Sequence, residues 1–450
     1  MSEDTSRSGG PAAELRDRIS AKSAVVGIIG MGYVGLPLAV ASYEGGYPVV
    51  GFDINPATVD GLNAGRSHIG RILDDQLAAM SASGRFEATT EFSELARCDI
   101  VIICVPTPLS RHREPDLSFV ENSVRVIARY LRAGQLISLE STTYPGTTRE
   151  VSKPILEQTG LQSGVDFFLA YSPEREDPGN PIYDTASIPK VVGGDGADAI
   201  ELAAMFYQSV VSAVVPVSSC ETAEAVKLTE NIFRSVNIAL VNELKTIYGE
   251  MGINVWEVID AAKTKPFGYM AFYPGPGLGG HCIPIDPFYL TWKAREYGLS
   301  TRFIELAGEI NTVQPAKVVT RLGEALGQRF RKSLAGSRIL LIGLAYKKNV
   351  EDVRESPAFA LIELIQQHGG EVEYYDPHVP VVPPTREHGE LAGKKSVDWN
   401  PSAFGDYDAA LICTDHDAVD WTALASGARL IVDTRNALKD IPERGNIVMA

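Results

Sequence analysis

Residues 24–55, AVVGIIGMGYVGLPLAVASYEGGYPVVGFDIN, decide the fold of the first part of this chain. An apolar, β-branched run is followed by a stretch suited to a helix that ends at glycine, and then by a second apolar run. Such alternation is typical of a parallel sheet covered on both faces. The later runs CDIVIICVPTP and GQLISLESTT continue the series. We therefore expect residues 23–210 to form a doubly wound α/β domain.

The turn after the first predicted strand reads GMGYVG and opens the helix, which makes it a GxGxxG fingerprint. Its first glycine permits a tight turn, its second lets the backbone approach a pyrophosphate, and its third lets helix and strand pack closely. The helix N-terminus offers free N–H groups to phosphates. Asp53 ends the next strand, where it can accept hydrogen bonds from ribose hydroxyls, and no Arg follows at once to favour a 2′-phosphate. The pattern predicts NAD binding at Gly30, Gly32, Tyr33, Val34, Gly35 and Asp53; the alternative is a glycine turn used only for packing.

Thr107 in CVPTP follows another predicted strand. It is placed at the carboxyl edge of the sheet, where open α/β folds bind ligands. We expect it at the cofactor, although a proline-rich loop without function is the alternative.

The rest of the chain divides into a helical segment and a second α/β unit. Residues 221–253 contain no Pro, and no Gly before Gly249, which predicts one long helix. From Ser337 the α/β pattern returns, and Asp376 ends its second strand as Asp53 does in the first unit. Only the first unit has the full fingerprint, so the two should bind different ligands. We expect a flexible tail over 1–22 leading into a short helix, a helical central or dimerisation domain over 211–330 and a Rossmann-like domain over 331–450.

Composition excludes several classes of protein. The 41 Lys and Arg against 57 Asp and Glu give a net charge of −16, which disfavours nucleic acid and anionic membranes as partners. No window has the apolar length of a signal peptide or membrane span. The five cysteines are scattered without CxxC spacing, so neither a disulfide framework nor a metal site is expected. A cytoplasmic protein fits this composition.

Residues 274–286, PGPGLGGHCIPID, form the most informative segment. Four glycines and three prolines exclude a regular element and predict a shaped loop that holds Cys282 near backbone N–H donors. Such donors lower a thiol pKa or bind an oxyanion. A lone cysteine is more often a small buried apolar residue, but this loop, with His281 and Asp286 beside the thiol, favours a nucleophile.

Seven segments together resemble the UDP-glucose/GDP-mannose dehydrogenase family: GMGYVG, LESTTYPGT, YSPER, AVKLTENIFR, PGPGLGGHCIPID, GLAYKKNVEDVRES and VDTRN. They occur in the expected order from about residue 24, and the cysteine loop is highly specific to that family. The resemblance implies oxidation of a sugar C6 alcohol to a carboxylate with two NAD. Apart from the resemblance, a helical block in mid-chain usually joins domains or builds a dimer interface, so we expect it to join the two Rossmann-like domains and to form a homodimer or higher homo-oligomer through the long helix.

The resemblance also implies roles for individual residues. Cys282 would capture the aldehyde and pass through a thiohemiacetal and a thioester. Lys227 and Asn231, four apart on one helix face, would stabilise the oxyanion and position a water with Asp286, although spacing alone favours a solvated surface pair. Glu174 in YSPER would be the general base, and Thr142 would orient the water. The remaining predicted contacts are Arg354 at the cofactor or a substrate phosphate and, with Glu174, Lys227 and Asn231, Gly279, Lys347, Lys348 and Arg435 at the nucleotide sugar.

Two departures bear on the sugar. Members that act on glucose usually carry Ser before the nucleophile and Lys three residues after it, whereas this chain has His281 and Ile285. The sequences GGHC and YSPEREDPGN are similar instead to UDP-N-acetylhexosamine 6-dehydrogenases, above all the UDP-N-acetylglucosamine branch, which supplies surface polysaccharide synthesis. UDP-N-acetylmannosamine and UDP-glucose stay open as substrates. Two further alternatives are a single-hydride dehydrogenase of the 3-hydroxyacid type and a non-catalytic NAD-binding regulator.

Overall fold

The computed structural model describes residues 9–69, 72–110, 114–175, 185–280, 283, 285–385 and 388–450. It groups the chain into two compact units, residues 1–230 with 292–298 and residues 231–291 with 299–450. The segment expected as a separate helical domain over 211–330 is thus divided between the two units.

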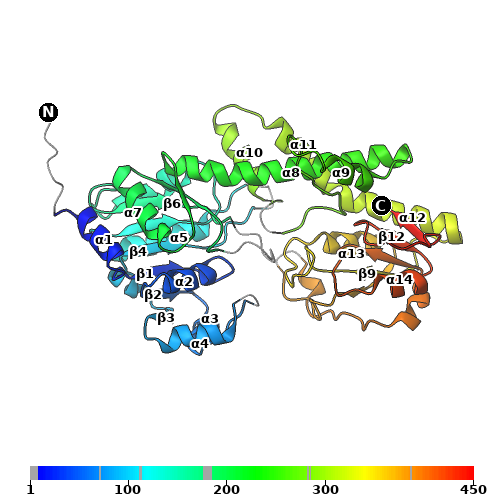
Figure 1. The fold of residues 1–450 in the computed structure, drawn as a ribbon, viewed down its shortest axis with the longest axis horizontal. Coiled ribbons are helices and arrows are strands. Elements are labelled where there is room, and N and C mark those ends of the chain that lie inside the picture. Colours follow the sequence, from blue (N-terminus) through cyan, green and yellow to red (C-terminus); the bar gives the residue numbers. More distant parts are fainter. Residues whose placement is uncertain are drawn as a thin grey trace. The chain divides into compact units, whose positions relative to one another are not determined.

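The first unit is built on an eight-stranded sheet of order β3-β2-β1-β4-β5-β6-β7-β8. Figure 1 labels β1, β2, β3, β4 and β6 of this sheet. Its neighbouring strands are parallel except at β6 and β7, where Ala170 pairs antiparallel with Gly194. The predicted doubly wound sheet is confirmed, and the reversal at β7 is an addition that the sequence pattern did not indicate. The strands are β1 (Val26–Ile29), β2 (Val49–Phe52), β3 (Phe86–Thr89), β4 (Ile100–Ile103), β5 (Leu136–Leu139), β6 (Phe168–Tyr171), β7 (Lys190–Gly194) and β8 (Val214–Pro216).

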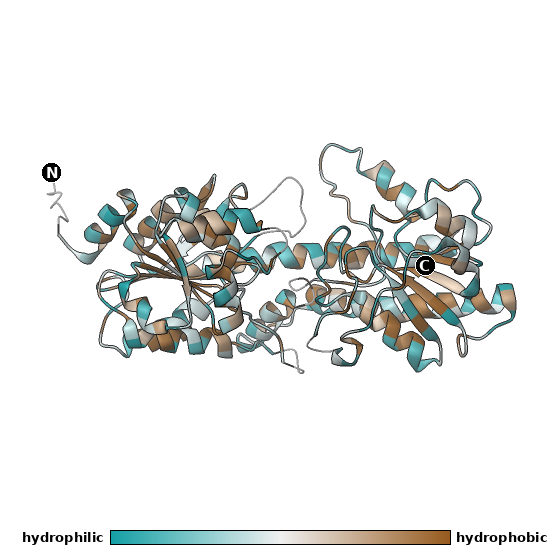
Figure 2. Ribbon diagram, turned by 90° about the horizontal axis from the view of Figure 1, so that it is seen from below, coloured by the Kyte–Doolittle hydropathy of each residue, from teal (hydrophilic) through white to brown (hydrophobic). Residues whose placement is uncertain are grey.

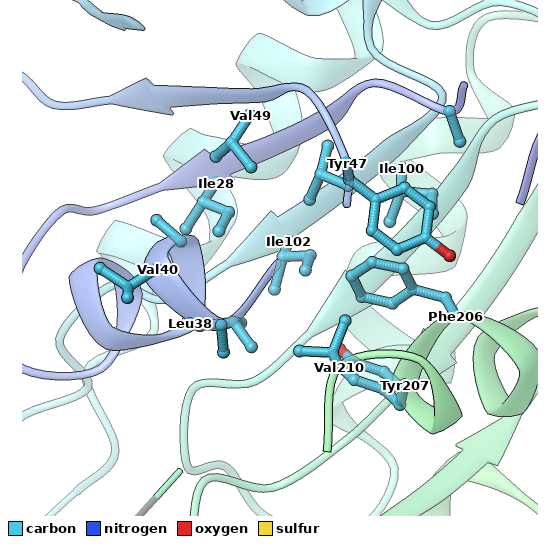
Figure 3. Close-up of a cluster of buried hydrophobic side chains, with 14 of the residues drawn as sticks. Ile28, Leu38, Val40, Tyr47, Val49, Ile100, Ile102, Phe206, Tyr207 and Val210 are labelled. Atoms are coloured by element: carbon cyan, nitrogen blue, oxygen red, sulfur yellow. The ribbon is translucent and has the colours of Figure 1, made fainter. Parts of the chain in front are cut away.

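Both faces of this sheet are buried, because successive residues of its strands enter different apolar clusters. Ile28 and Ile102 lie in one cluster with Phe206, as Figure 3 shows. Ile29 and Ile103 lie in the other. The helices of this unit are α1 (Pro11–Ser20), α2 (Gly35–Glu44), α3 (Pro56–Asn63), α4 (Asp74–Ala82), η1 (Phe92–Arg97), α5 (Ser118–Tyr130), η2 (Thr148–Ser152), α6 (Lys153–Glu157) and α7 (Ala197–Gln208).

Helix α1 lies within the segment expected to be a flexible tail leading into a short helix, and it packs on the first unit. Leu15 and Ile19 are 1% and 2% exposed and belong to the first apolar cluster. Arg18 also pairs with Asp99 at 2.7 Å. The burial of these two large side chains therefore holds residues 11–20 against the first unit. The polar composition of the segment concealed the four-residue spacing of Leu15 and Ile19.

The long helix α8 (Cys220–Glu250) confirms the predicted element and ends three residues earlier than expected. The chain turns at Gly252, whose φ of +73° suits glycine. Further helices follow: α9 (Val255–Ala262), α10 (Asp286–Glu296), α11 (Arg302–Thr312) and α12 (Gln314–Phe330). Among the described residues, no helix has both the length and the apolar character needed to cross a bilayer.

The second unit contains a five-stranded, all-parallel sheet of order β10-β9-β11-β12-β13, which confirms the second predicted α/β unit. Apolar residues line the strands of both sheets, as the brown arrows in Figure 2 show. The elements are β9 (Arg338–Ile342), α13 (Pro357–Gln367), β10 (Glu371–Tyr375), η3 (Gly389–Leu391), η4 (Pro401–Asp406), β11 (Ala409–Ile412), α14 (Trp421–Gly427), β12 (Ile431–Asp433) and β13 (Ile447–Met449).

Candidate active site

Of the three fingerprint glycines, Gly30 and Gly32 lie between β1 and α2 and Gly35 is the first residue of α2; each meets a different constraint. Gly30 has a φ of +90°, and a Cβ there would lie 2.6 Å from the Cys104 carbonyl oxygen. A Cβ at Gly35 would overlap the Gly30 carbonyl oxygen. A Cβ at Gly32 would meet no protein atom within 4 Å. Protein packing therefore explains the first and third glycines, whereas the open space at Gly32 fits the approach of a pyrophosphate.

Asp53 follows β2 and faces this turn. Its Oδ2 accepts a hydrogen bond from the Met31 N–H at 3.0 Å, and its Oδ1 accepts one from the Asn55 N–H at 2.9 Å. Thr107, after β4, is only 4% exposed, and Tyr33 is 39% exposed. Val34 is the N-cap of α2. The structure thus gathers these predicted NAD residues at the carboxyl ends of β1, β2 and β4, as a dinucleotide site requires.

The corresponding turn of the second unit is closed by its own hydrogen bonds. Asp376, after β10, accepts from the backbone N–H groups of Leu344, Ala345, His378 and Val379 at 2.6 to 3.1 Å. The His416 ring lies 3.1 Å from the same carboxylate. These five donors occupy Asp376, so it cannot serve a ribose as Asp53 can. The two units therefore offer different surfaces to a nucleotide.

Thr142 and Glu174 follow β5 and β6, which are neighbouring parallel strands. The carboxyl ends of parallel strands share one edge, and the structure brings both residues to the edge that carries the fingerprint. Glu174 Oε1 accepts from the Arg175 N–H at 2.7 Å, and Glu174 Oε2 lies 3.7 Å from the Lys190 ammonium. Ser141 ties this edge to β4, because its hydroxyl hydrogen-bonds both the N–H and the carbonyl of Val105.

Lys227 and Asn231 are not a solvated pair on α8, since their exposed fractions are 6% and 7%. Asn231 Nδ2 donates to Asp286 Oδ2 at 2.5 Å. Asp286 begins α10 and is 2% exposed. The structure thus joins Asn231 and Asp286, which sequence spacing alone could not pair, and buries the charge of Lys227 one turn away on the same helix.

The nucleophile predicted from the sequence, Cys282, lies outside the described residues, as do His281 and Pro284. The part of the loop before them is held within the second unit. Gly275 N–H donates to the Asn242 side chain at 3.0 Å, and Gly280 N–H donates to the Arg354 carbonyl at 3.2 Å. A Cβ at Gly279 or Gly280 would lie 2.9 Å from Tyr346. The glycines therefore let the loop pack directly on the turn after β9.

The four basic residues predicted at the substrate or cofactor differ in their partners. Lys348 pairs with Asp417 at 2.6 Å, and Arg354 forms a forked pair with Asp352. Arg435 donates from Nε to the Cys413 carbonyl at 2.8 Å and lies against Gly275. Lys347 is half-buried. Lys348 and Arg354 would have to leave or share a carboxylate to bind phosphate.

Sequence reasoning missed a buried polar cluster at the same edge of the first sheet. Lys190 donates to Glu140 Oε2 at 2.8 Å, and Tyr207 donates to Glu140 Oε1 at 2.6 Å. The signal was available, because Glu140 stands at the end of an apolar strand, where a charged residue needs a partner. Among the described residues, no group of three or more His, Cys, Asp or Glu gathers as a metal would require.

Comparison with known families covers almost the whole chain. Residues 24–211 match the NAD binding domain of the UDP-glucose/GDP-mannose dehydrogenase family, residues 221–313 its central domain, and residues 340–440 its UDP binding domain.

Individual relatives differ in their sugar. The chain is 37% identical to a UDP-N-acetyl-D-mannosamine dehydrogenase of Pyrococcus horikoshii, over 93% of this chain and 96% of that one. It is 36% identical to a UDP-N-acetyl-D-glucosamine 6-dehydrogenase of Pseudomonas aeruginosa, over 88% and 91%. The solved structure of the Pyrococcus horikoshii enzyme superposes with a TM-score of 0.85 at 34% identity, covering 94% of this chain and 98% of that one.

Proposed function

Because the chain belongs to the UDP-glucose/GDP-mannose dehydrogenase family, whose members include NAD-dependent UDP-sugar 6-dehydrogenases, we propose that it oxidises the C6 alcohol of a UDP-N-acetylhexosamine to the uronic acid. The observation that carries this proposal is the buried contact of Asn231 with Asp286, one turn from the buried Lys227. Polar groups buried in this way beside a glycine-rich loop suit a site where charge develops on an oxygen.

Gly30, Gly32, Gly35 and Asp53 would hold NAD, which would supply the hydride acceptor for each of two oxidations at the substrate carbon. Between them, the Cys282 thiolate adds to the C6 aldehyde and forms a carbon–sulfur bond. Loss of the second hydride leaves a thioester. Attack by water then forms a carbon–oxygen bond, breaks the carbon–sulfur bond and returns the thiolate. The covalent bond keeps the aldehyde from escaping.

Lys227 and Asn231 stabilise the oxyanion on C6 in this scheme. A cation that is excluded from water offsets a developing alkoxide more strongly than a surface lysine does. Asp286 accepts from Asn231, fixes the orientation of that amide, and holds the attacking water. These roles are supported by the burial of all three side chains.

Glu174 is the general base for thiohemiacetal oxidation and thioester hydrolysis, and Thr142 orients the water. Their support is a common location at the carboxyl edge of β5 and β6 and the partial exposure of Glu174, whose side chain is 15% exposed. A base must exchange protons with substrate or solvent, and this carboxylate is open enough to do so.

The second unit binds the UDP end of the substrate through Lys347, Arg435 and the backbone at Gly279, with Lys348 and Arg354 joining once they leave Asp417 and Asp352. A planar guanidinium such as Arg435 suits phosphate or sugar oxygens. The match of residues 340–440 to the family's UDP binding domain supports this assignment.

UDP-N-acetylglucosamine is the proposed sugar nucleotide, and surface polysaccharide synthesis is its proposed use. Support comes from His281 before the nucleophile and Ile285 after it, where glucose-type members carry Ser and Lys. Relatives acting on N-acetylmannosamine and N-acetylglucosamine have nearly equal identity, so UDP-N-acetylmannosamine is the first competitor. Initial rates of NADH release on a panel of UDP-sugars, compared as kcat/KM, decide between them.

The test of the chemistry is Cys282→Ala, with Cys413→Ala as the matched control. Cys413 is a fully buried free thiol whose pKa burial raises to about 11, so it is inert. We expect Cys282→Ala to abolish uronic acid formation while NAD still binds, and Cys413→Ala to keep activity. Acid formation at the normal rate by Cys282→Ala would remove the thiol from the mechanism.

The chain also forms a homodimer through α8 in this proposal. Phe233, Leu240 and Ile247 are each 48% exposed and recur every seven residues, so they share one face of the helix. An apolar stripe of this kind is typical of an interface.

A cytoplasmic location is likewise proposed, and it is supported by the free thiols of Cys98, Cys104, Cys220 and Cys413.

A further inference from the structure

The buried cluster of Glu140, Lys190 and Tyr207 lies next to Glu174, the proposed general base. Strand β7 runs antiparallel to β6, so its first residue, Lys190, reaches the edge at which the parallel strands end. Continuing the register from the pair of Tyr171 and Gly193 brings Lys190 opposite Glu174. The reversal of one strand therefore delivers a lysine to the carboxyl edge.

One buried cation serves two carboxylates in this cluster. The Lys190 ammonium lies 2.8 Å from Glu140 and 3.7 Å from Glu174. The side chains of Glu140 and Lys190 are 0% and 6% exposed, whereas that of Glu174 is 15% exposed. Glu140 is thus an internal anchor that water does not reach, and Glu174 is the member of the group that a substrate or water can reach.

Burial raises the pKa of the Glu140 carboxyl, whereas the Lys190 ammonium and the hydrogen bond from Tyr207 favour its charged form. Burial by itself lowers the pKa of Lys190, but the two carboxylates outweigh burial and raise it, so the ammonium stays charged. Burial raises the pKa of Cys104 well above its usual range and does the same for Tyr207, so both are neutral. From α8, Glu230 faces this region and is paired with Arg175.

We propose that Lys190 is a positioning residue for proton transfer. Glu140, itself held by the Tyr207 hydroxyl, fixes the Lys190 ammonium. The ammonium in turn holds the Glu174 carboxylate and divides its charge between the two acids. The inference rests on the proposed role of Glu174 as base. Two carboxylates compete for one positive charge, so Glu140 limits how strongly the carboxylate form of Glu174 is stabilised. Glu140 thereby sets the pH at which kcat falls on the acid side of the pH profile, the acid limb, without contacting the substrate.

The first test is Glu140→Gln in the full-length enzyme, with Ser138→Ala as control. Ser138 contacts Tyr207 but carries no charge. In Glu140→Gln the charge of Lys190 belongs to Glu174 alone, so the acid limb of kcat against pH moves to lower pH by about one unit. The KM for the sugar nucleotide stays within about twofold. A limb that matches the wild type and Ser138→Ala would overturn the inference.

A second set of variants keeps the test decisive if Glu140→Gln fails to fold. Lys190→Arg keeps the limb near its wild-type position, whereas Lys190→Met loses most activity. Equal behaviour of the Arg and Met variants contradicts a role for the charge.

Glu174→Gln separates this inference from the function beneath it. If this variant loses the acid limb while Glu140→Gln leaves the limb in place, Glu174 is the base and the inference about Lys190 fails. If the limb persists in Glu174→Gln, the base has been assigned wrongly, and the inference falls with it. Cys282-dependent acid formation survives either outcome.

Discussion

Two aspartates at equivalent places in the two units differ because of their neighbours. Asp53 and Asp376 each follow the second strand of a parallel sheet. Asp53 accepts two backbone hydrogen bonds, whereas Asp376 accepts four and also contacts His416. The sequence indicated the shared position, and the missing glycines of the second unit indicated different ligands. The saturation of Asp376 depended on tertiary partners and could not be foreseen.

The open space at Gly32 predicts that alanine at this position affects NAD binding, whereas alanine at the packed Gly35 affects folding stability. In Gly32→Ala the added methyl meets no protein atom, so thermal unfolding should be unchanged, while NAD affinity falls by about tenfold or more because the methyl occupies the pyrophosphate path. In Gly35→Ala the methyl overlaps the Gly30 carbonyl and should cost roughly 1–3 kcal/mol of folding free energy. NAD titration and thermal unfolding of both variants check this. Unchanged NAD affinity in folded Gly32→Ala would contradict the cofactor site.

At the scale of elements, sequence patterns located strands and long helices better than the contacts between them. The apolar runs placed β1, β2, β4 and β5, and the absence of glycine placed α8. The antiparallel β7 was missed, because direction is set by the connection to β6 and not by the composition of the strand. The pairing of α8 with the turn before η2, made by Glu224, was missed for the same reason: it joins residues far apart in sequence.

Glu224 makes that contact sensitive to pH. Burial raises its pKa to about 7, although hydrogen bonds from the N–H groups of Gly146 and Thr148 and from the Thr148 hydroxyl favour the charged form. The folded state therefore holds a proton that the unfolded chain loses near pH 4.5. Stability from this group is greatest below that pH, declines up to about pH 7 and is constant above it.

Comparison of the wild type with Glu224→Gln isolates this effect. The variant should be less stable throughout, since an amide cannot accept all three donors, but it lacks the titration. Between pH 5 and pH 7.5 the wild type should lose about 4 °C in thermal midpoint relative to the variant. Differential scanning fluorimetry across that range measures it, and parallel curves for the two proteins would contradict the assignment.

For the whole molecule, recognition of the family and of NAD as cofactor from the sequence is confirmed by matches to all three family domains. From the sequence we expected three folded domains, whereas the structure groups the residues into two compact units. One boundary between these units falls within α8, between Glu230 and Asn231, so this helix contributes residues to both. The roles of Cys282, Lys227 and Glu174 stay predictions.

Assembly is tested on the stripe of α8. Leu240→Glu places a charge on the proposed apolar interface and should convert a dimer to a monomer, with mass halved in light scattering after size exclusion. Leu240→Met keeps the face apolar and should leave the mass of the dimer unchanged. The same mass for both variants would show that this face is not the interface.

The central claim, two oxidations on one sugar carbon, is tested most directly by counting NADH. With UDP-N-acetylglucosamine limiting and NAD in excess, absorbance at completion should give two NADH for each sugar nucleotide consumed, together with one uronic acid. A yield of one NADH and an aldehyde or ketone would contradict the double oxidation and favour a single-hydride dehydrogenase on the same fold.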